Sequence, residues 1–176
     1  MDRINELRLE NRRLKQQIED YENRVLALVG NTIIEASGEG ETKELLNEKI
    51  IDFIRTSVDQ INIVAPRIDA FYSTEIRKAA ERGLPVLLIT RDRHLWEKKQ
   101  KILYDELNST NGINVINNPH VNYLLLYNSE IAMYSGGDLD KEVLSNSVLI
   151  ITSIKEAAKI NKIADIFTAM LPSFMR

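Results

Sequence analysis

The stretch NPHVNYLLLYNSEIAMYSGGD, residues 118–138, decides how this chain of 176 residues is expected to fold. An apolar run from Val121 to Tyr127 meets the polar pair Asn128-Ser129, and a second apolar run from Ile131 to Tyr134 follows. Two apolar runs joined by a short polar link are typical of a β-hairpin. His120 stands at the entrance of the first strand. The pair Gly136-Gly137 follows the second strand, where backbone can approach a ligand or another chain closely.

Strands and helices alternate on both sides of this hairpin. Short strands are predicted at residues 31–36, 60–65, 84–90, 113–116 and 148–151. Helices are predicted from Lys43 to Val58, from Asp69 or Ser73 to Gly83, from Leu95 to Leu107 and from Ile154 to Leu171. This alternation predicts an α/β fold. Crossover connections give parallel neighbours, and the hairpin adds an antiparallel section to the sheet.

Residues 2–29 carry an apolar repeat whose spacings alternate between three and four, as in a left-handed coiled coil. The a positions are Ile4, Asn11, Ile18 and Val25, and the d positions are Leu7, Leu14, Tyr21 and Leu28. β-Branched residues at a with leucine at d favour a parallel dimer, and one asparagine at a fixes its register. We therefore expect residues 1–30 to form a dimerisation helix and residues 31–176 to form the α/β domain. The alternative is a single helix that packs its apolar stripe on its own domain.

The hairpin also resembles the signature of the phospholipase D superfamily, H-x-K-x-x-x-x-D continued by G-S-x-N. His120 matches the histidine, Asn122 stands in place of the lysine, Tyr127 stands in place of the aspartate, and Ser135 matches the serine. The order and spacing of the elements from about residue 45 to residue 171 are those of one half of a phospholipase D-like fold. The resemblance thus implies a single phospholipase D-like domain, with a mixed sheet flanked by helices and a degenerate motif.

In that superfamily the histidine is the phosphoryl nucleophile, the lysine holds the phosphate oxygens, and a distal carboxylate orients the histidine. The Asn122 amide is uncharged, and the Tyr127 phenol is not anionic at neutral pH. Electrostatic stabilisation of the transferring group is usually the largest catalytic contribution. We therefore expect no enzyme activity and no catalytic residue, and the sequence indicates neither a cofactor nor a metal site. On this interpretation His120 caps an element or lies at the edge of the core.

Further candidate ligand-binding residues follow the predicted strands. Ligands of open α/β sheets bind beyond the carboxyl ends of the strands. Arg67 comes after one such strand, and the segment Arg91-Asp92-Arg93-His94 comes after the next. Arginine there can bind phosphate, carboxylate or sugar hydroxyls. The candidate ligand-binding residues are therefore Arg67, Arg91, Arg93, His120 and Asn122. The alternative is that the charged segment is a solvated turn whose charges compensate one another.

Composition narrows the classes of partner. The formal net charge is −3, so no overall electrostatic attraction draws the chain to nucleic acid or to anionic lipid. There is no cysteine, and the charged N-terminus lacks the apolar core of a signal peptide. We expect a cytoplasmic protein with no membrane partner and no direct nucleic-acid binding.

The heptad helix followed by a phospholipase D-like domain is similar to the C-terminal effector domain of TrmB-like archaeal transcription regulators. Those proteins carry a winged-helix DNA-binding domain ahead of the coil, and no such segment is recognisable here. The favoured hypothesis is a non-catalytic binding or regulatory module, a pseudoenzyme. Its expected partners are a second copy in a parallel homodimer and an unidentified protein or small-molecule effector. The alternative is a dimeric phosphodiesterase or nuclease that uses His120 from each subunit.

The coiled-coil hypothesis makes a direct prediction for Asn11. The change Asn11→Ile removes a buried polar pair and extends the apolar stripe, so the melting temperature should rise while the dimer becomes less exclusive. Analytical ultracentrifugation should then detect trimers or tetramers beside dimers. A lower melting temperature would mean that Asn11 makes a specific stabilising contact and that the coil prediction needs revision.

Overall fold

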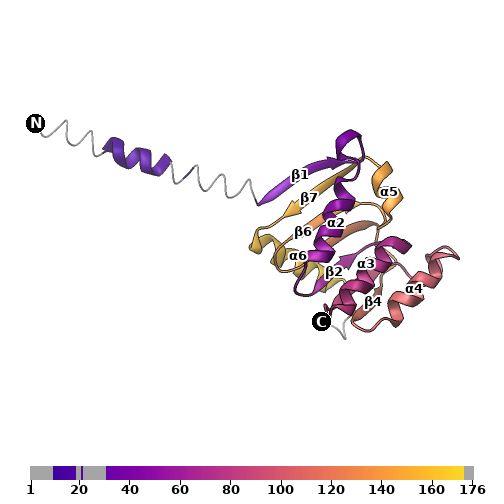
Figure 1. The fold of residues 1–176 in the computed structure, drawn as a ribbon. Helices are drawn as coiled ribbons and strands as arrows, with labels where there is room; N and C mark the ends of the chain where they lie inside the picture. Colours follow the sequence, from indigo (N-terminus) through magenta and orange to yellow (C-terminus); the bar gives the residue numbers. More distant parts are fainter. Residues whose placement is uncertain (1–9, 19–20, 22–30, 173–176) are drawn as a thin grey trace, which may run out of the picture.

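The computed structural model describes residues 10–18, 21 and 31–172. Seven strands form one sheet in the order β1-β7-β6-β5-β2-β3-β4 (Figure 1). They are β1 (Thr32–Ser37), β2 (Ile61–Val64), β3 (Val86–Thr90), β4 (Ile113–Asn117), β5 (Tyr123–Tyr127), β6 (Ala132–Gly136) and β7 (Leu149–Ile154). Strands β2, β3 and β4 are parallel, and every other pairing is antiparallel. The predicted mixed α/β sheet is therefore confirmed.

Helices cover the two faces of the sheet unequally. They are α2 (Leu45–Thr56), α3 (Ala70–Glu81), α4 (Gln100–Ser109), α5 (Lys141–Asn146) and α6 (Ala157–Ala169), with short 3-10 turns η1 (Gly40–Thr42) and η2 (Arg93–Leu95). The first four helices enclose the main core, which includes Leu124 and Leu126 of β5. Helix α6 packs on the opposite face, against Leu125 and Tyr127 of the same strand. One face of the sheet is thus covered by a single helix, whereas the opposite face is covered by four.

The central hairpin forms as predicted, with a longer link. Tyr123–Tyr127 pairs with Ala132–Gly136, so four residues join the strands where the sequence indicated the pair Asn128-Ser129. The Asn128 side chain explains the difference. Its Oδ1 accepts hydrogen bonds from the backbone N–H groups of Glu130 and Ile131, at 2.9 Å each. Its Nδ2 donates to Ser57 Oγ at 3.0 Å, which fastens the link to the end of α2.

Two predicted helices begin later than expected. The helix predicted from Leu95 starts at Gln100, because the Trp96 indole N–H donates to the Arg91 carbonyl at 3.1 Å and Trp96 is extended. Trp96 nevertheless lies in the core, as predicted. The helix predicted from Ile154 starts at Ala157, because β7 pairs with β1 and β6 as far as Ile154.

Helix α5 was not predicted. It has six residues, too few to show a helical repeat of apolar side chains. Its start is marked by Asp140, whose side chain accepts hydrogen bonds from the N–H groups of Glu142 and Val143 at 3.0 Å each. This cap is a sequence signal that could have located the helix.

The segments that follow β2 and β6 are joined through Asp69. Leu139 donates its N–H to the Arg67 carbonyl, and Asp69 donates its N–H to the Leu139 carbonyl, both at 3.0 Å. The Asp69 carboxylate then accepts from Tyr72 N–H at 2.8 Å and from Lys141 N–H at 2.9 Å. Asp69, and not Ser73, is therefore the cap of α3, and it also holds the first residue of α5.

Burial makes the charged form of Asp69 less favourable and raises its pKa, an effect that the two N–H donors oppose. A carboxyl whose pKa is higher in the folded state than in the unfolded state binds its proton more tightly when folded. Its contribution to the free energy of unfolding therefore falls as the pH rises through the interval between the two pKa values.

The N-terminal segment is helical at residues 10–18 and at residue 21. Leu14, Ile18 and Tyr21 of the predicted stripe are all more than half exposed. Ile4, Leu7, Val25 and Leu28 lie outside the described residues, so the coiled coil and its boundary at residue 30 stay predictions. Within the described part of the chain, no helix combines the length and the apolar character needed to cross a membrane.

We expect Asp69→Ala to lower the free energy of unfolding by about 2 kcal/mol, since it removes a helix cap and a second hydrogen bond to a charged group. Asp69→Asn keeps an acceptor oxygen, so its free energy of unfolding should fall by less. The matched control is Asp92→Ala, because Asp92 precedes η2 without a capping hydrogen bond from its side chain. Urea unfolding measures all three variants, and equal losses for Asp69→Ala and Asp92→Ala would contradict the role given to Asp69.

Candidate functional site

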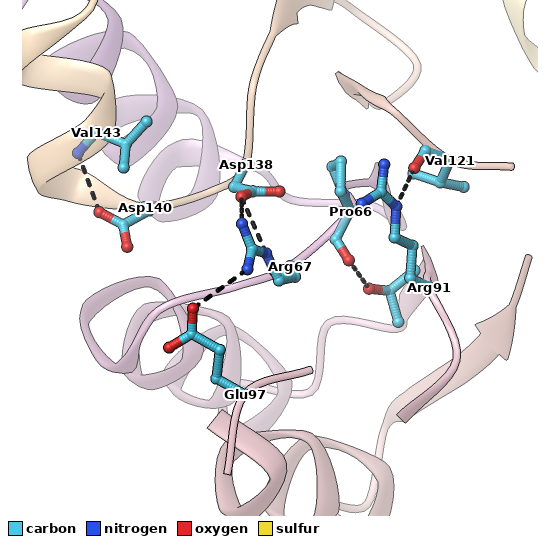
Figure 2. A network of polar contacts seen from close by, with 9 residues as sticks. Pro66, Arg67, Arg91, Glu97, Val121, Asp138, Asp140 and Val143 are labelled. Atoms are coloured by element: carbon cyan, nitrogen blue, oxygen red, sulfur yellow. Dashed lines mark hydrogen bonds and ion pairs between the residues drawn. The ribbon is translucent and has the colours of Figure 1, made fainter. Parts of the chain in front are cut away.

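The candidate site lies where the ends of β2 and β3 meet the entrance of β5 and the exit of β6. Arg67 follows β2 and points toward Asp138, which follows β6 (Figure 2). Arg67 Nε and Nη2 both donate to Asp138 Oδ2, at 3.0 Å and 2.6 Å. Arg67 Nη1 also lies 3.6 Å from Glu97 Oε1. The Asp138 side chain is 20% exposed, so this ion pair is better shielded from water than a typical surface pair.

Arg91 supports the entrance of β5. Its Nε donates to the Val121 carbonyl at 2.6 Å, and its backbone N–H reaches the Pro66 carbonyl at 3.4 Å (Figure 2). Thr90 Oγ1 donates to the same Pro66 carbonyl at 3.0 Å. Arg91 therefore ties the end of β3 to both the segment after β2 and the segment that contains the motif histidine.

His120 and Asn122 flank Val121, and both are exposed. The turn that presents them is held by hydrogen bonds from two backbone N–H groups, one to a backbone carbonyl and one to a side chain. Asn118 N–H donates to the Thr90 carbonyl at 2.8 Å, and His120 N–H donates to Asn118 Oδ1 at 3.0 Å. Within residues 31–172, no side chain forms a hydrogen bond with the His120 imidazole. The fold thus brings Arg67, Arg91 and the segment 118–122 to one edge of the sheet, whereas the imidazole has no orienting partner there.

Arg93 lies in a different environment. It forms a two-pronged ion pair with Asp105 of α4, with both N···O distances at 2.6 Å, and about half of each side chain is exposed. The Arg93 hydrogen bond lowers the pKa of Asp105. Arg93 is therefore engaged with α4, and its role as a ligand residue stays a prediction.

Of the other two motif positions, Tyr127 lies at the far end of β5, whereas Ser135 lies near the site but is buried. Tyr127 ends β5, so about 13 Å of strand separates it from Tyr123 at the start. Its ring packs edge-on against Phe167 at 5.2 Å, and burial raises its pKa to about 12. Ser135 is 2% exposed, on the main-core side of β6 opposite Leu124, and its Oγ makes no hydrogen bond within the described residues. Tyr127 is thus a core residue too distant to orient His120.

Sequence reasoning missed Asp138 as the partner of Arg67. The sequence places Asp138 directly after Gly136-Gly137, which could have marked it as a site residue. Its pairing with Arg67, however, depends on the contact between two segments that are distant in the sequence. The described residues contain no group of three or more His, Asp or Glu side chains that could hold a metal ion. The site is therefore an arginine-lined edge at which Arg67 already has a carboxylate partner.

Removing that carboxylate should expose an anion-binding site. We expect Asp138→Asn to raise the affinity for inorganic phosphate at least about fivefold over the unsubstituted protein, because the Arg67 fork becomes available to phosphate oxygens. The matched control is Asp105→Asn, which frees Arg93 on an exposed surface and should change phosphate affinity less. Calorimetric titration with phosphate measures both, and equal affinities in all three proteins would show that the pair does not block the site.

Comparisons with known proteins identify the fold. No protein-family model and no curated protein sequence matches this chain. Two solved structures match over 79% of it: NucT from Helicobacter pylori (TM-score 0.66, 14% identity, 95% of that chain covered) and the phospholipase D family member Nuc from Salmonella typhimurium (0.65, 11%, 92%). TrmBL2, an archaeal chromatin protein, matches over 90% of this chain and 64% of its own (0.56, 12%). The chain therefore has the phospholipase D-like fold that its degenerate motif predicted.

Proposed function

We propose that this chain is a non-catalytic binding or regulatory module, dimerised through residues 1–30. The observation that carries the proposal is the pairing of Arg67 with Asp138 beside a motif in which Asn122 replaces the lysine. Phosphoryl transfer needs positive charge directed at the transferring group. Here Arg67 is paired with the Asp138 carboxylate, the Arg91 Nε–H is directed at the Val121 carbonyl, and the amide at position 122 adds no charge.

The surroundings of the remaining motif residues support this proposal. A nucleophilic histidine needs an orienting partner, and none of the described side chains hydrogen-bonds the His120 imidazole. The residue in the place of the motif aspartate, Tyr127, is held in the core against Phe167. Both features are expected of a protein that has this fold but does not use it for catalysis.

The likeness to TrmBL2, an archaeal chromatin protein, supports a non-catalytic role. A match over 90% of this chain has to extend into the first 30 residues, because residues 31–176 make up a smaller share than that. This coverage supports the proposal that a segment ahead of the phospholipase D-like domain belongs to the same layout. TrmBL2 is described as binding DNA. For this chain, with a net charge of −3, we propose a protein or a small-molecule effector as partner, in the cytoplasm.

The alternative is a dimeric phosphodiesterase that uses His120 from each subunit. The observation that favours it is the match to a phospholipase D family member over 92% of that protein's length. Dimerisation is expected on either hypothesis, so it does not separate them. The charge at the site separates the two hypotheses, so a measurement of phosphodiesterase activity decides between them.

We expect no turnover of a chromogenic phosphodiester such as bis(p-nitrophenyl) phosphate above that of His120→Ala. Arg93→Ala serves as a control for loss of an arginine engaged outside the site. In the same preparation, fluorescence anisotropy with duplex DNA at about 150 mM salt should show no saturable binding, since a chain with a net charge of −3 has no overall electrostatic attraction to DNA phosphates. Turnover that disappears in His120→Ala would establish the phosphodiesterase instead. Saturable DNA binding would contradict the proposed class of partner.

A further inference from the structure

A cavity lies at the end of the sheet opposite the candidate site, between the start of β2 and helix α6. Its volume is about 340 Å³, within the range of pockets that hold small molecules. Strand pairing sets Tyr127, Asn62 and Leu87 side by side on the face of the sheet that α6 covers, and all three line the cavity. Because Tyr127 ends β5 and the candidate site lies at the entrance of that strand, the cavity is a separate feature. We call it the α6 cavity.

Asn62 is a polar side chain in a strand that is otherwise apolar, and it is only 7% exposed. Its Oδ1 accepts a hydrogen bond from Gln60 Nε2 at 2.7 Å. Its Nδ2, which can donate two hydrogen bonds, has only the Tyr127 carbonyl, at a long distance of 3.5 Å. A buried donor without good partners lowers the free energy of unfolding, and an apolar side chain at this position would avoid that cost.

Tyr127 is a second buried donor on the same cavity. It is 7% exposed, its ring packs against Phe167, and its hydroxyl has no hydrogen-bond partner in the described part of the chain. A buried tyrosine hydroxyl usually has such a partner. Burial raises the pKa of Tyr127 to about 12, so the phenol keeps its proton at neutral pH and can donate it in a hydrogen bond. The α6 cavity is thus lined by two donors that lack adequate acceptors within the domain.

Acceptors and further polar groups complete the lining. Asp59 Oδ2 accepts a hydrogen bond from Ser129 N–H at 3.1 Å, whereas Asp59 Oδ1 accepts none from the described residues. Asn161 and Thr168 add an amide and a hydroxyl from α6. No lysine or arginine is among the described residues that line the cavity. A phosphate or a carboxylate would therefore find no counter-charge there.

The walls of the α6 cavity are apolar. Leu87 lies on the sheet side, and Ile160 and Phe167 lie on the helix side. A ligand that suits both the walls and the polar groups has apolar faces and an edge with donors and acceptors, as a nucleobase does. A sugar carries hydroxyl groups around its ring, and the apolar walls would leave some of them unpaired.

We propose that the α6 cavity binds a nucleobase that carries an amino group, as the free base or as a nucleoside without phosphate. The Asn62 amide and the Tyr127 hydroxyl donate to acceptor atoms on the edge of the base. The Asp59 carboxylate accepts from the amino group, as carboxylates do with the amino group of cytosine. The apolar walls cover the two faces of the ring.

The proposal names the chemical class of the small-molecule effector in the proposed function. It rests on that function only in that the ligand is an effector and not a substrate. Binding itself depends on the cavity alone, so binding and activity can be tested independently.

The experiment is a calorimetric titration of the full chain with adenosine, guanosine, cytidine and uridine. We expect at least one of the first three to bind with a dissociation constant below about 1 mM. Cytidine and uridine are the matched pair, because they differ in the amino group that Asp59 would contact. Cytidine should bind at least about fivefold more tightly than uridine, and ribose should not bind. The 5′-monophosphate of the best ligand should bind more weakly than the nucleoside, since no cation lines the cavity.

Two variants connect the binding to the cavity. Tyr127→Phe removes only the hydroxyl that has no partner, so it should leave the melting temperature unchanged and weaken nucleoside binding at least about fivefold. The matched control is Tyr123→Phe at the other end of β5, which should leave the affinity within about twofold. Asn62→Val replaces the poorly paired amide by a good strand former. It should keep or raise the melting temperature and still weaken binding, a combination that a purely structural role of Asn62 would not produce.

The inference is overturned if none of the four nucleosides binds at 1 mM (about −4.1 kcal/mol), if uridine or ribose binds as tightly as cytidine, or if Tyr127→Phe and Tyr123→Phe weaken binding equally. Absence of binding together with absence of phosphodiester turnover would remove this site and leave the proposed function in place. Turnover that depends on His120, with nucleoside binding intact, would overturn the proposed function and leave the site.

Discussion

The architecture depends on the contact between the segment after β2 and the segment after β6, which Asp69 completes. One carboxylate receives N–H groups from the first turn of α3 and from the start of α5, and the backbone pairing of Leu139 with Arg67 and Asp69 lies beside it. Asp69 is the N-cap of α3, and at the start of α5 it acts beside Asp140, the N-cap of that helix. Because the contact joins the parallel half of the sheet to the antiparallel half, it also determines which residues meet at the candidate site.

That contact explains the character of the site. Asp138 lies one residue before Leu139, so the same pairing that places Leu139 beside Arg67 delivers Asp138 to the guanidinium. In a phospholipase D-like fold, an edge that gathers arginines would be expected to receive an anion from solution. In this chain the anion that Arg67 binds is the carboxylate of Asp138. The charge of Arg67 thereby holds together the segments that follow β2 and β6.

The sequence predicted most of the sheet, because apolar runs bounded by polar turns are a local signal. It failed where a distant contact decided the outcome. Leu95 and Trp96 read as helical, yet the hydrogen bond from the Trp96 indole to Arg91 keeps Trp96 extended. Helix α5 is too short to show a repeat, and only its capping Asp140 marks it. At the site, the motif located the segment 118–122, but no local pattern could show that Arg67 pairs with Asp138 or that Tyr127 lies beneath α6.

The pairing of β1 with β7 has a consequence for synthesis. These strands come from opposite ends of the domain sequence, with Thr32 beside Ile154, so β1 has no partner until nearly the whole domain has left the ribosome. The residues ahead of β1 emerge first. Loop closure over such a separation is slow compared with the formation of a helix. If residues 1–30 dimerise as proposed, two nascent chains on one message have time to meet through these segments before either sheet is complete. In that case assembly would precede folding, and β1 would be added to a domain whose partner is already at hand.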